Sequence, residues 1–194
     1  MFCDNPFDNR NSANIFAAMK TISILVPQAS TIQAIADPQN LFMAINQYLV
    51  QKGKKPMFKV QLVGAKKVVK LNHGTYSVRT DVQLSGVRKT DLILIPALYG
   101  DLPTAVDKNK TLIPWIIEQY KKGAEIASIC VGAFLLAATG LLNGRKCSTH
   151  WARQDQLREM FPEVEVVDYS IITEEHRIYS SGGGNTYGIY FCIW

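Results

Sequence analysis

One short apolar run constrains the fold of this chain more than any other feature. It reads Asp91-Leu-Ile-Leu-Ile-Pro96, and a run of this length and composition is typical of a strand. Because apolar side chains point to both faces of that strand, both faces must be covered, as at the centre of a parallel sheet. The composition agrees, since 47% of the residues are hydrophobic and only 19% are charged, against about 25% in a typical domain.

Strands and helices are expected to alternate along most of the chain. Besides the run above, the patterns predict strands at 21–27, 58–62, 68–71, 76–78, 124–129, 146–149, 164–167 and 178–180. One helix is predicted to begin at Asp37-Pro38 and to end near Gly53, and others are predicted at 112–123, 131–140 and 151–160. The segment 72–75 is expected to form a hairpin turn. The 194 residues therefore predict one α/β domain, a three-layer α/β/α sandwich with a mostly parallel sheet.

The positive charge of the chain does not by itself indicate a DNA-binding domain. The 21 Lys and Arg against 16 Asp and Glu give a net charge of +5, which is ordinary for a protein of this size. A basic stretch either contacts DNA phosphates or, more commonly, covers exposed faces of strands and loops. Its members are Lys54, Lys55, Lys59, Lys66, Lys67 and Lys70.

Cysteine use and hydropathy predict a cytoplasmic protein. The four cysteines have no CxxC or Cys/His metal-ligand spacing and are too sparse for a disulfide scaffold. The first 20 residues lack a basic segment followed by an apolar stretch, so they do not resemble a signal peptide. No run approaches the roughly 18 apolar residues of a membrane span. We expect no membrane partner, no metal and no cofactor.

The two ends of the chain are unusual. Residues 1–20 are polar and precede the first strong strand, so we expect a loosely held leader, either from an upstream start or added to the fold, with the domain covering 21–194. The last ten residues close on Ile-Tyr-Phe-Cys-Ile-Trp without a cap or a polar flank, as if a helix were cut short. Alternatively, a short buried element simply ends there.

The sharpest local signal is Ile126-Ala-Ser-Ile-Cys130-Val-Gly132-Ala133, in which a cysteine stands between a buried strand and a helix. A tight strand-to-helix turn needs small neighbours, presents its central side chain above the sheet edge, and places the sulfur at a helix N-terminus that favours thiolate. The alternative is a buried structural cysteine, which is common. We favour the elbow.

His150 is the histidine best placed to act as a base for Cys130. It follows the strand predicted at 146–149, and the carboxyl ends of the strands in an open α/β sheet form one rim where ligands bind. His73, in the expected turn, and His176, beside two glutamates, are interpreted as solvated surface residues without a role.

These motifs resemble a known superfamily. The segment SICVGAFLLAATGLLNGR followed by STHW resembles the ThiJ/PfpI superfamily, whose fold is class I glutamine amidotransferase-like and flavodoxin-like. ISILVPQASTIQAIADPQNLFMAINQYL and DLILIPALYG are most similar to the N-terminal domain of AraC/XylS-type transcriptional regulators. The resemblance covers residues 21–187. It implies a domain that binds a metabolite or forms the dimer of a regulator, while a separate helix-turn-helix module, which these residues do not contain, binds the DNA.

The resemblance also implies which residues form the site, and where this chain departs from the enzymes. Cys130 matches the elbow cysteine and His150 the downstream histidine, while N–H groups near Ala97 and Val131 correspond to an oxyanion-binding region. Enzymatic relatives carry an acid near the positions of Ser30 and Thr31, or at that of Gln33. Isonitrile-hydratase-like relatives also carry Thr where this chain has Val131. The carboxylate that would assist the cysteine is therefore missing.

The remaining candidates surround the same rim. Gly182-Gly183-Gly184 either cradles an anion or, more commonly, permits close backbone packing. Trp151 either walls a ligand pocket or belongs to the core or a dimer interface, and Asp101 is a weaker pocket candidate. The predicted ligand-binding set is Cys130, Val131, His150, Trp151, Ala97, Tyr99, Gln28 and Gln33.

Three functions remain open, and the first is favoured. It is a non-enzymatic, ligand-sensing and dimerising domain of an AraC-type regulator, with a small-molecule effector bound around Cys130, His150 and the 27–33 loop. The second is a cysteine-dependent hydrolase, hydratase or amidase acting on a small amide-like or carbonyl compound, with Cys130 as nucleophile and His150 as base. The third is a redox protein, which requires an exposed Cys130 of low pKa.

Overall fold

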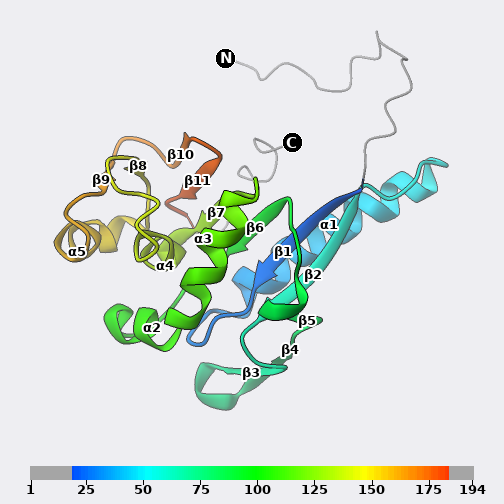
Figure 1. The fold of residues 1–194 in the computed structure, drawn as a ribbon, viewed down its shortest axis with the longest axis horizontal. Helices are drawn as coiled ribbons and strands as arrows, with labels where there is room; N and C mark the ends of the chain where they lie inside the picture. The colour runs from blue at the N-terminus through cyan, green and yellow to red at the C-terminus, as the bar shows by residue number, and fades with distance from the viewer. Residues whose placement is uncertain (1–18, 184–194) are drawn as a thin grey trace, which may run out of the picture.

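The computed structural model describes residues 19–183 and is built on a seven-stranded central sheet (Figure 1). The strand order is β10-β11-β7-β6-β1-β2-β5, and every neighbouring pair is parallel except β10 with β11. The strands of this sheet are β1 Lys20–Leu25, β2 Phe58–Gly64, β5 Val82–Gln83, β6 Leu92–Ile95, β7 Glu125–Ile129, β10 Ile172–Glu175 and β11 Ile178–Ser181.

Two small sheets and five α-helices complete the described fold. The hairpin pairs β3 Val68–Leu71 with β4 Tyr76–Arg79, and β8 Lys146–Cys147 pairs with β9 Glu165–Val166. The helices are α1 Gln33–Gln51, α2 Leu102–Lys108, α3 Ile113–Lys121, α4 Ala133–Ala137 and α5 Gln154–Met160. The mostly parallel sheet with helices on both sides confirms the predicted α/β/α class.

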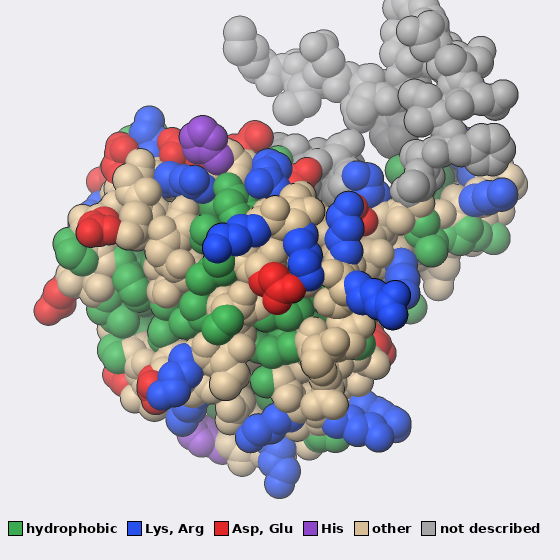
Figure 2. Space-filling view, in the orientation of Figure 1, with side chains coloured by type: hydrophobic (Ala, Val, Ile, Leu, Met, Phe, Trp, Pro, Cys, Tyr) green, Lys and Arg blue, Asp and Glu red, His purple; other side chains and the backbone are tan. Residues whose placement is uncertain are grey.

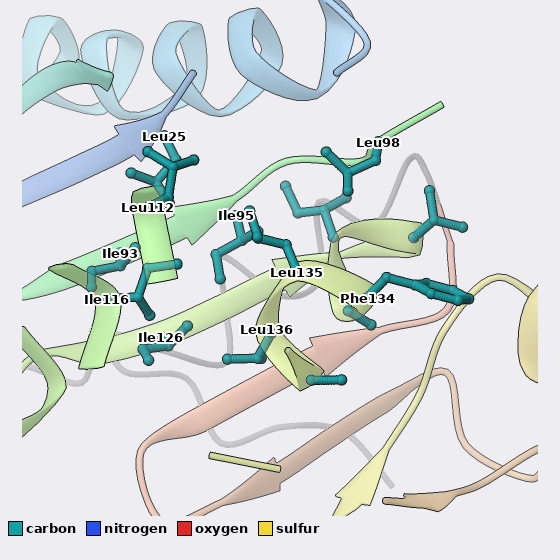
Figure 3. Close-up of a cluster of buried hydrophobic side chains, with 14 of the residues drawn as sticks. Leu25, Ile93, Ile95, Leu98, Leu112, Ile116, Ile126, Phe134, Leu135 and Leu136 are labelled. Carbon is teal, nitrogen blue, oxygen red and sulfur yellow. The ribbon is translucent and has the colours of Figure 1, made fainter. Parts of the chain in front are cut away.

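The central position of β6 confirms the interpretation of the apolar run. All four of its residues are fully buried, between β1 and β7. Leu92 and Leu94 belong to the core cluster beneath α1, whereas Ile93 and Ile95 belong to the cluster formed with α2, α3 and α4. Figure 3 shows Ile95 beside Leu135 of α4, and Ile93 beside Ile116 of α3. Successive side chains of a strand point to opposite faces, so one short run joins both cores.

Helix α1 begins earlier than the sequence predicts. It starts at Gln33, and the N–H groups of Ile35 and Ala36 already bond to the carbonyl of Ile32, so Pro38 lies inside the helix. The expected start at Asp37-Pro38 is therefore wrong. Burial of Ala34 and Ile35 against the sheet stabilises the additional turn although the proline removes one helical hydrogen bond. The predicted end holds, because Gly53 follows with a left-handed φ of 69°.

Helix α2 is an element that the sequence analysis missed. It begins with an acidic cap and a proline, the same combination that wrongly predicted a helix start at Asp37-Pro38. The Asp101 carboxylate accepts a hydrogen bond from the N–H of Thr104 at 3.0 Å, and a proline stands in the first turn. The capping acid and the proline are separated by one residue here, whereas Asp37 and Pro38 are adjacent. Asp101-Leu-Pro103 was therefore the signal that could have located this helix.

Other predicted elements occur near their expected positions, but β8 differs. The hairpin β3–β4 turns at Asn72–Gly74, and β1 begins at Lys20, the last residue assigned to the leader. Strand β8 ends at Cys147 and pairs with β9 instead of extending the central sheet. Residues 1–18 of the leader and the expected C-terminal helix lie outside the described residues. Within residues 19–183, no helix is both long and apolar enough to cross a membrane.

Candidate functional site

Cys130 occupies the elbow that the sequence predicted. It follows the buried strand β7 and adopts a left-handed φ of +54°, which a non-glycine residue rarely adopts. A turn of 3-10 helix, Cys130–Gly132, then leads into α4. Gly132 is required by sterics, since a Cβ there would lie 2.6 Å from the carbonyl oxygen of Ile95 and 2.7 Å from that of Pro96. The small residue after the cysteine thus lets α4 approach the end of β6.

The thiol of Cys130 is held in its neutral form by its surroundings. Cys130 is only 8% exposed, and this burial raises the pKa of its thiol. A hydrogen bond from the N–H of Val131 lowers the same pKa to a smaller extent. The expectation that the helix terminus favours thiolate is therefore corrected, because desolvation outweighs the turn's N–H groups. Burial also raises the pKa of the fully buried Cys147 to about 11.

We expect the thiols of Cys130 and Cys147 in the native chain to react slowly with iodoacetamide at pH 8. The thiolate is the reactive species, and a rise in pKa from 9.0 to about 11 lowers the thiolate fraction of Cys147 about a hundredfold. Cys130 should be alkylated faster than Cys147 but more slowly than a free thiol such as glutathione in the same solution. The alkylation rate of Cys130 should rise with pH. Peptide mass spectrometry measures each site, with urea-unfolded protein as the control. Rapid labelling of native Cys130 at pH 7 would contradict a buried thiol with a raised pKa.

His150 follows a residue that is hydrogen-bonded to the elbow, and its Nδ1 atom is engaged in a cap. The preceding residue, Thr149, donates a hydrogen bond from its hydroxyl to the carbonyl of Cys130 at 3.1 Å. The Nδ1 atom of His150 accepts the N–H of Ala152 at 3.2 Å, which caps the following turn, and its ring stacks on Trp151. A neutral imidazole that accepts at Nδ1 carries its proton on Nε2. Among the described residues, no hydrogen bond joins His150 to Cys130.

The 27–33 loop approaches the elbow rim without supplying a carboxylate. The hydroxyl of Ser30 donates to the carbonyl of Pro27 at 2.8 Å, and the N–H of Thr31 donates to the carbonyl of Ala97 at 3.0 Å. Gln33 is exposed at the start of α1. Over residues 19–183, no Asp or Glu side chain hydrogen-bonds to Cys130.

A cavity of about 540 Å³, here called the elbow cavity, lies beside this rim. Trp151 is 78% exposed, so it does not belong to the core, and it lines the cavity together with the exposed Tyr169 and Ile171. Gly182 closes one side and packs tightly, since a Cβ there would lie 2.9 Å from the Ser148 Oγ. Close packing at the start of the glycine run is thereby confirmed, while Gly184 lies outside the described residues. The complete lining is Ser148, Thr149, Trp151, Gln154, Asp168, Tyr169, Ser170, Ile171, Gly182 and Gly183.

The predicted ligand-binding residues do not all surround one cavity. Gln28 and Tyr99 line a second hollow of about 430 Å³, here called the hairpin cavity, between the β3–β4 turn, the loop after β1 and α2. Its other lining residues are Ala29, Lys70, Asn72, His73, Gly74, Gly100, Asp101, Thr104, Ala105 and Lys108. Sequence reasoning assigned no role to His73 and missed Lys108. The residues Cys130, Val131, Ala97, His150 and Gln33 line neither cavity.

No metal centre is formed by the described residues. No group of three or more His, Cys, Asp or Glu side chains within residues 19–183 is arranged to hold a metal ion. The site is therefore described by an elbow cysteine and the cavities at the carboxyl ends of the strands.

The fold and the elbow together define a class of protein: a mostly parallel α/β/α domain with a cysteine at the turn after a central strand. The DJ-1/PfpI family matches residues 46–192, which is most of the chain. The chain belongs to the DJ-1/PfpI family, as the resemblance to the ThiJ/PfpI superfamily indicated.

The related sequences include both a regulator and an enzyme. The HTH-type transcriptional regulator CdhR of Pseudomonas aeruginosa is 30% identical over 107 residues, which are 55% of this chain and 31% of CdhR. The isonitrile hydratase of Pseudomonas putida is 31% identical over 103 residues, which are 53% of this chain and 42% of the hydratase. This chain thus spans less than half the length of either relative.

Solved structures confirm the fold. A Vibrio parahaemolyticus protein assigned to the transcriptional regulators superposes with a TM-score of 0.76 at 22% identity, covering 89% of this chain and 88% of that one. An AraC family transcriptional regulator from Pseudomonas putida gives a TM-score of 0.63 at 14% identity, covering 86% and 85%. At these identities the likeness shows a shared fold and leaves function to the site.

Proposed function

We propose that this chain is the effector-binding and dimerising domain of an AraC-type transcriptional regulator and that it is not an enzyme. A small-molecule effector binds in the elbow cavity, and DNA is bound by a helix-turn-helix module outside the described residues. The similarity to CdhR supports a regulatory role. The fold shared with an AraC family regulator is compatible with that role.

The environment of Cys130 is the observation that carries this proposal. A nucleophilic cysteine needs an accessible thiolate and an oriented base. Here burial raises the pKa of the Cys130 thiol, and the Nδ1 atom of the nearby histidine is engaged in capping. The elbow is thus preserved as a turn that brings α4 against the end of β6. The volume of the elbow cavity, about 540 Å³, falls within the range of roughly 300–1,000 Å³ that is typical of small-molecule sites.

A ligand panel with a stability readout tests the sensor directly. We expect one small amine, amide or amino acid to raise the melting temperature, since a ligand at about 100 times its Kd stabilises the native state by roughly 2.7 kcal/mol. Trp151→Ala should abolish that shift by removing a wall of the elbow cavity, whereas Cys130→Ala should retain it. Tyr48→Ala, which removes another exposed aromatic side chain (58% exposed, against 78% for Trp151) outside the cavity, is the matched control. Sedimentation of the same samples should give a dimer.

The outcomes separate the proposal from its failure. Stabilisation without chemical change of the ligand supports a sensor, and a monomer at all concentrations contradicts the dimerisation part. A panel without any stabilising compound contradicts effector binding. Chemical conversion of a panel compound that is lost in Cys130→Ala would show an enzyme.

The second candidate, a cysteine-dependent hydrolase, hydratase or amidase, is favoured by one feature. Cys130 keeps the left-handed φ of +54° and an N–H directed at its sulfur, as a nucleophile elbow requires. The isonitrile hydratase among the relatives is an enzyme. Substrate binding would then have to release His150 from the Ala152 N–H and expose the thiol. A redox role has less support, because it requires an exposed thiol of low pKa.

A further inference from the structure

We propose that the hairpin cavity is a second ligand site, distinct from the elbow cavity, which takes a small organic carboxylate. Its volume of about 430 Å³ is sufficient for a compound the size of a substituted benzoate. No residue lines both cavities. The inference goes beyond the proposed function, because it holds whether or not the elbow cavity binds an effector.

The backbone around this cavity is unusually constrained. Five of its lining residues adopt a left-handed φ, and three of them are not glycine: Ala29 at 57°, Asn72 at 47° and His73 at 55°. Gly74 and Gly100 are the other two, at 94° and 82°. These residues come from three separate loops, and strained backbone conformations of this kind concentrate at ligand sites and switch regions. Local turn chemistry accounts for the Asn72-His73-Gly74 hairpin but does not account for Ala29.

Hydrogen bonds hold in place the loop after β1, which lines the cavity. The buried side chain of Asn109 accepts the N–H of Gln28 at 2.7 Å and donates to the carbonyl of Gln28 at 2.7 Å. The N–H of Tyr99 donates to the carbonyl of Ala29 at 2.8 Å, which joins the loop after β1 to the loop after β6. A preformed site loses little conformational entropy when a ligand binds.

The charges around the cavity favour an anion. Lys70 comes from β3 and Lys108 from the end of α2, and neither ammonium group pairs with an acid among the described residues. The single acid in the lining, Asp101, caps α2 by accepting the Thr104 N–H, which lowers its pKa, and the two ammonium groups outnumber this one carboxylate. Figure 2 shows Lys and Arg side chains along the lower edge of the molecule, where Figure 1 draws the β3–β4 hairpin. An ammonium pair of this kind binds a carboxylate through charge-assisted hydrogen bonds.

Two rings provide an apolar surface beside these charges. The imidazole of His73 and the phenol ring of Tyr99 meet edge to face with their centroids 6.1 Å apart. This contact joins the hairpin turn to the loop after β6, two segments that are distant in sequence. A ligand with a planar apolar body and a carboxylate matches both features, since aromatic rings pack well on one another and both lysines line the same cavity.

Benzoate is a suitable probe, with benzamide as its uncharged counterpart of nearly the same shape. In an NMR titration of the native chain, we expect saturable benzoate binding that shifts the amide signals of Gly74 and Gly100 and leaves that of Gly182 unchanged. Benzamide should bind at least tenfold more weakly, because it lacks the charge that pairs with the lysines.

Paired lysine substitutions identify the residues responsible. Lys70→Gln combined with Lys108→Gln should weaken benzoate binding at least tenfold. Lys54→Gln combined with Lys121→Gln removes two exposed charges outside both cavities and should change the affinity less than twofold. All four side chains are exposed, so the variants should fold. The proposal is overturned by any of three results: no saturable binding, equal affinity for benzamide, or equal loss in the two double variants.

Discussion

Replacing Phe134 by alanine is expected to lower the free energy of unfolding by about 3–5 kcal/mol, the largest effect of any change considered. Phe134 is fully buried in α4 and meets Phe161 edge to face with centroids 6.4 Å apart. Figure 3 shows its ring extending from α4 at the edge of the cluster that contains Leu135 and Leu136. The deletion removes buried apolar surface and leaves a cavity that the surrounding sheet and helices cannot fill.

Thermal or urea unfolding measures this loss. For a chain of this size the melting temperature should fall by roughly 6–20 °C. Tyr169→Ala is the control, because it deletes a similar aromatic ring that is 74% exposed and should change stability by less than about 0.5 kcal/mol. Equal effects of the two substitutions would show that Phe134 is not part of a packed core.

Gly132→Ala is expected to destabilise the elbow by about 1–3 kcal/mol, although alanine is the better helix former. The added methyl group would lie 2.6 Å from the carbonyl oxygen of Ile95 and 2.7 Å from that of Pro96. Both oxygens belong to the backbone at the end of the central strand β6, so relief requires α4 to move away from the sheet. The gain in helix propensity, at most about 1 kcal/mol, does not offset this displacement.

Gly86→Ala provides a matched control for the elbow glycine. Its added methyl group would also meet an atom at 2.7 Å, but that atom is a side-chain methyl of the partly exposed Val82, which can shift more easily than a backbone oxygen of the sheet. We therefore expect a change within about 0.5 kcal/mol at Gly86. Urea unfolding of the two variants compares them, and a stability at Gly132→Ala equal to that of the native chain would contradict the close approach of α4 and β6.

Local patterns predicted those parts of the fold that short-range physics determines. The apolar run at 91–96 indicated a central strand because a strand alternates its side chains between two faces. Gly53 marked the end of α1, and Asn72-His-Gly marked the hairpin, because left-handed turns favour these residues. The same reasoning failed at Asp37-Pro38, where burial of Ala34 and Ile35 extended the helix past its local start signal.

The sequence likewise predicted some features of the candidate site and not others. The sequence identified the Cys130 elbow and the missing acid, since both depend on residue types at fixed positions. It did not predict the raised pKa of Cys130, because desolvation depends on which distant side chains cover the sulfur. It also placed Gln28 and Tyr99 in one pocket with Trp151, whereas the structure assigns them to separate cavities.

By itself, the sequence determined the α/β class, the elbow with its small neighbours and the family of this protein, because periodicity, turn chemistry and motif spacing are local properties. Only the tertiary structure decided that the capping of His150 turns Nδ1 toward Ala152. It also decided that Lys70, His73 and Lys108 surround one hollow. These arrangements arise from contacts between segments far apart in the chain, and no local pattern encodes which of those segments will meet.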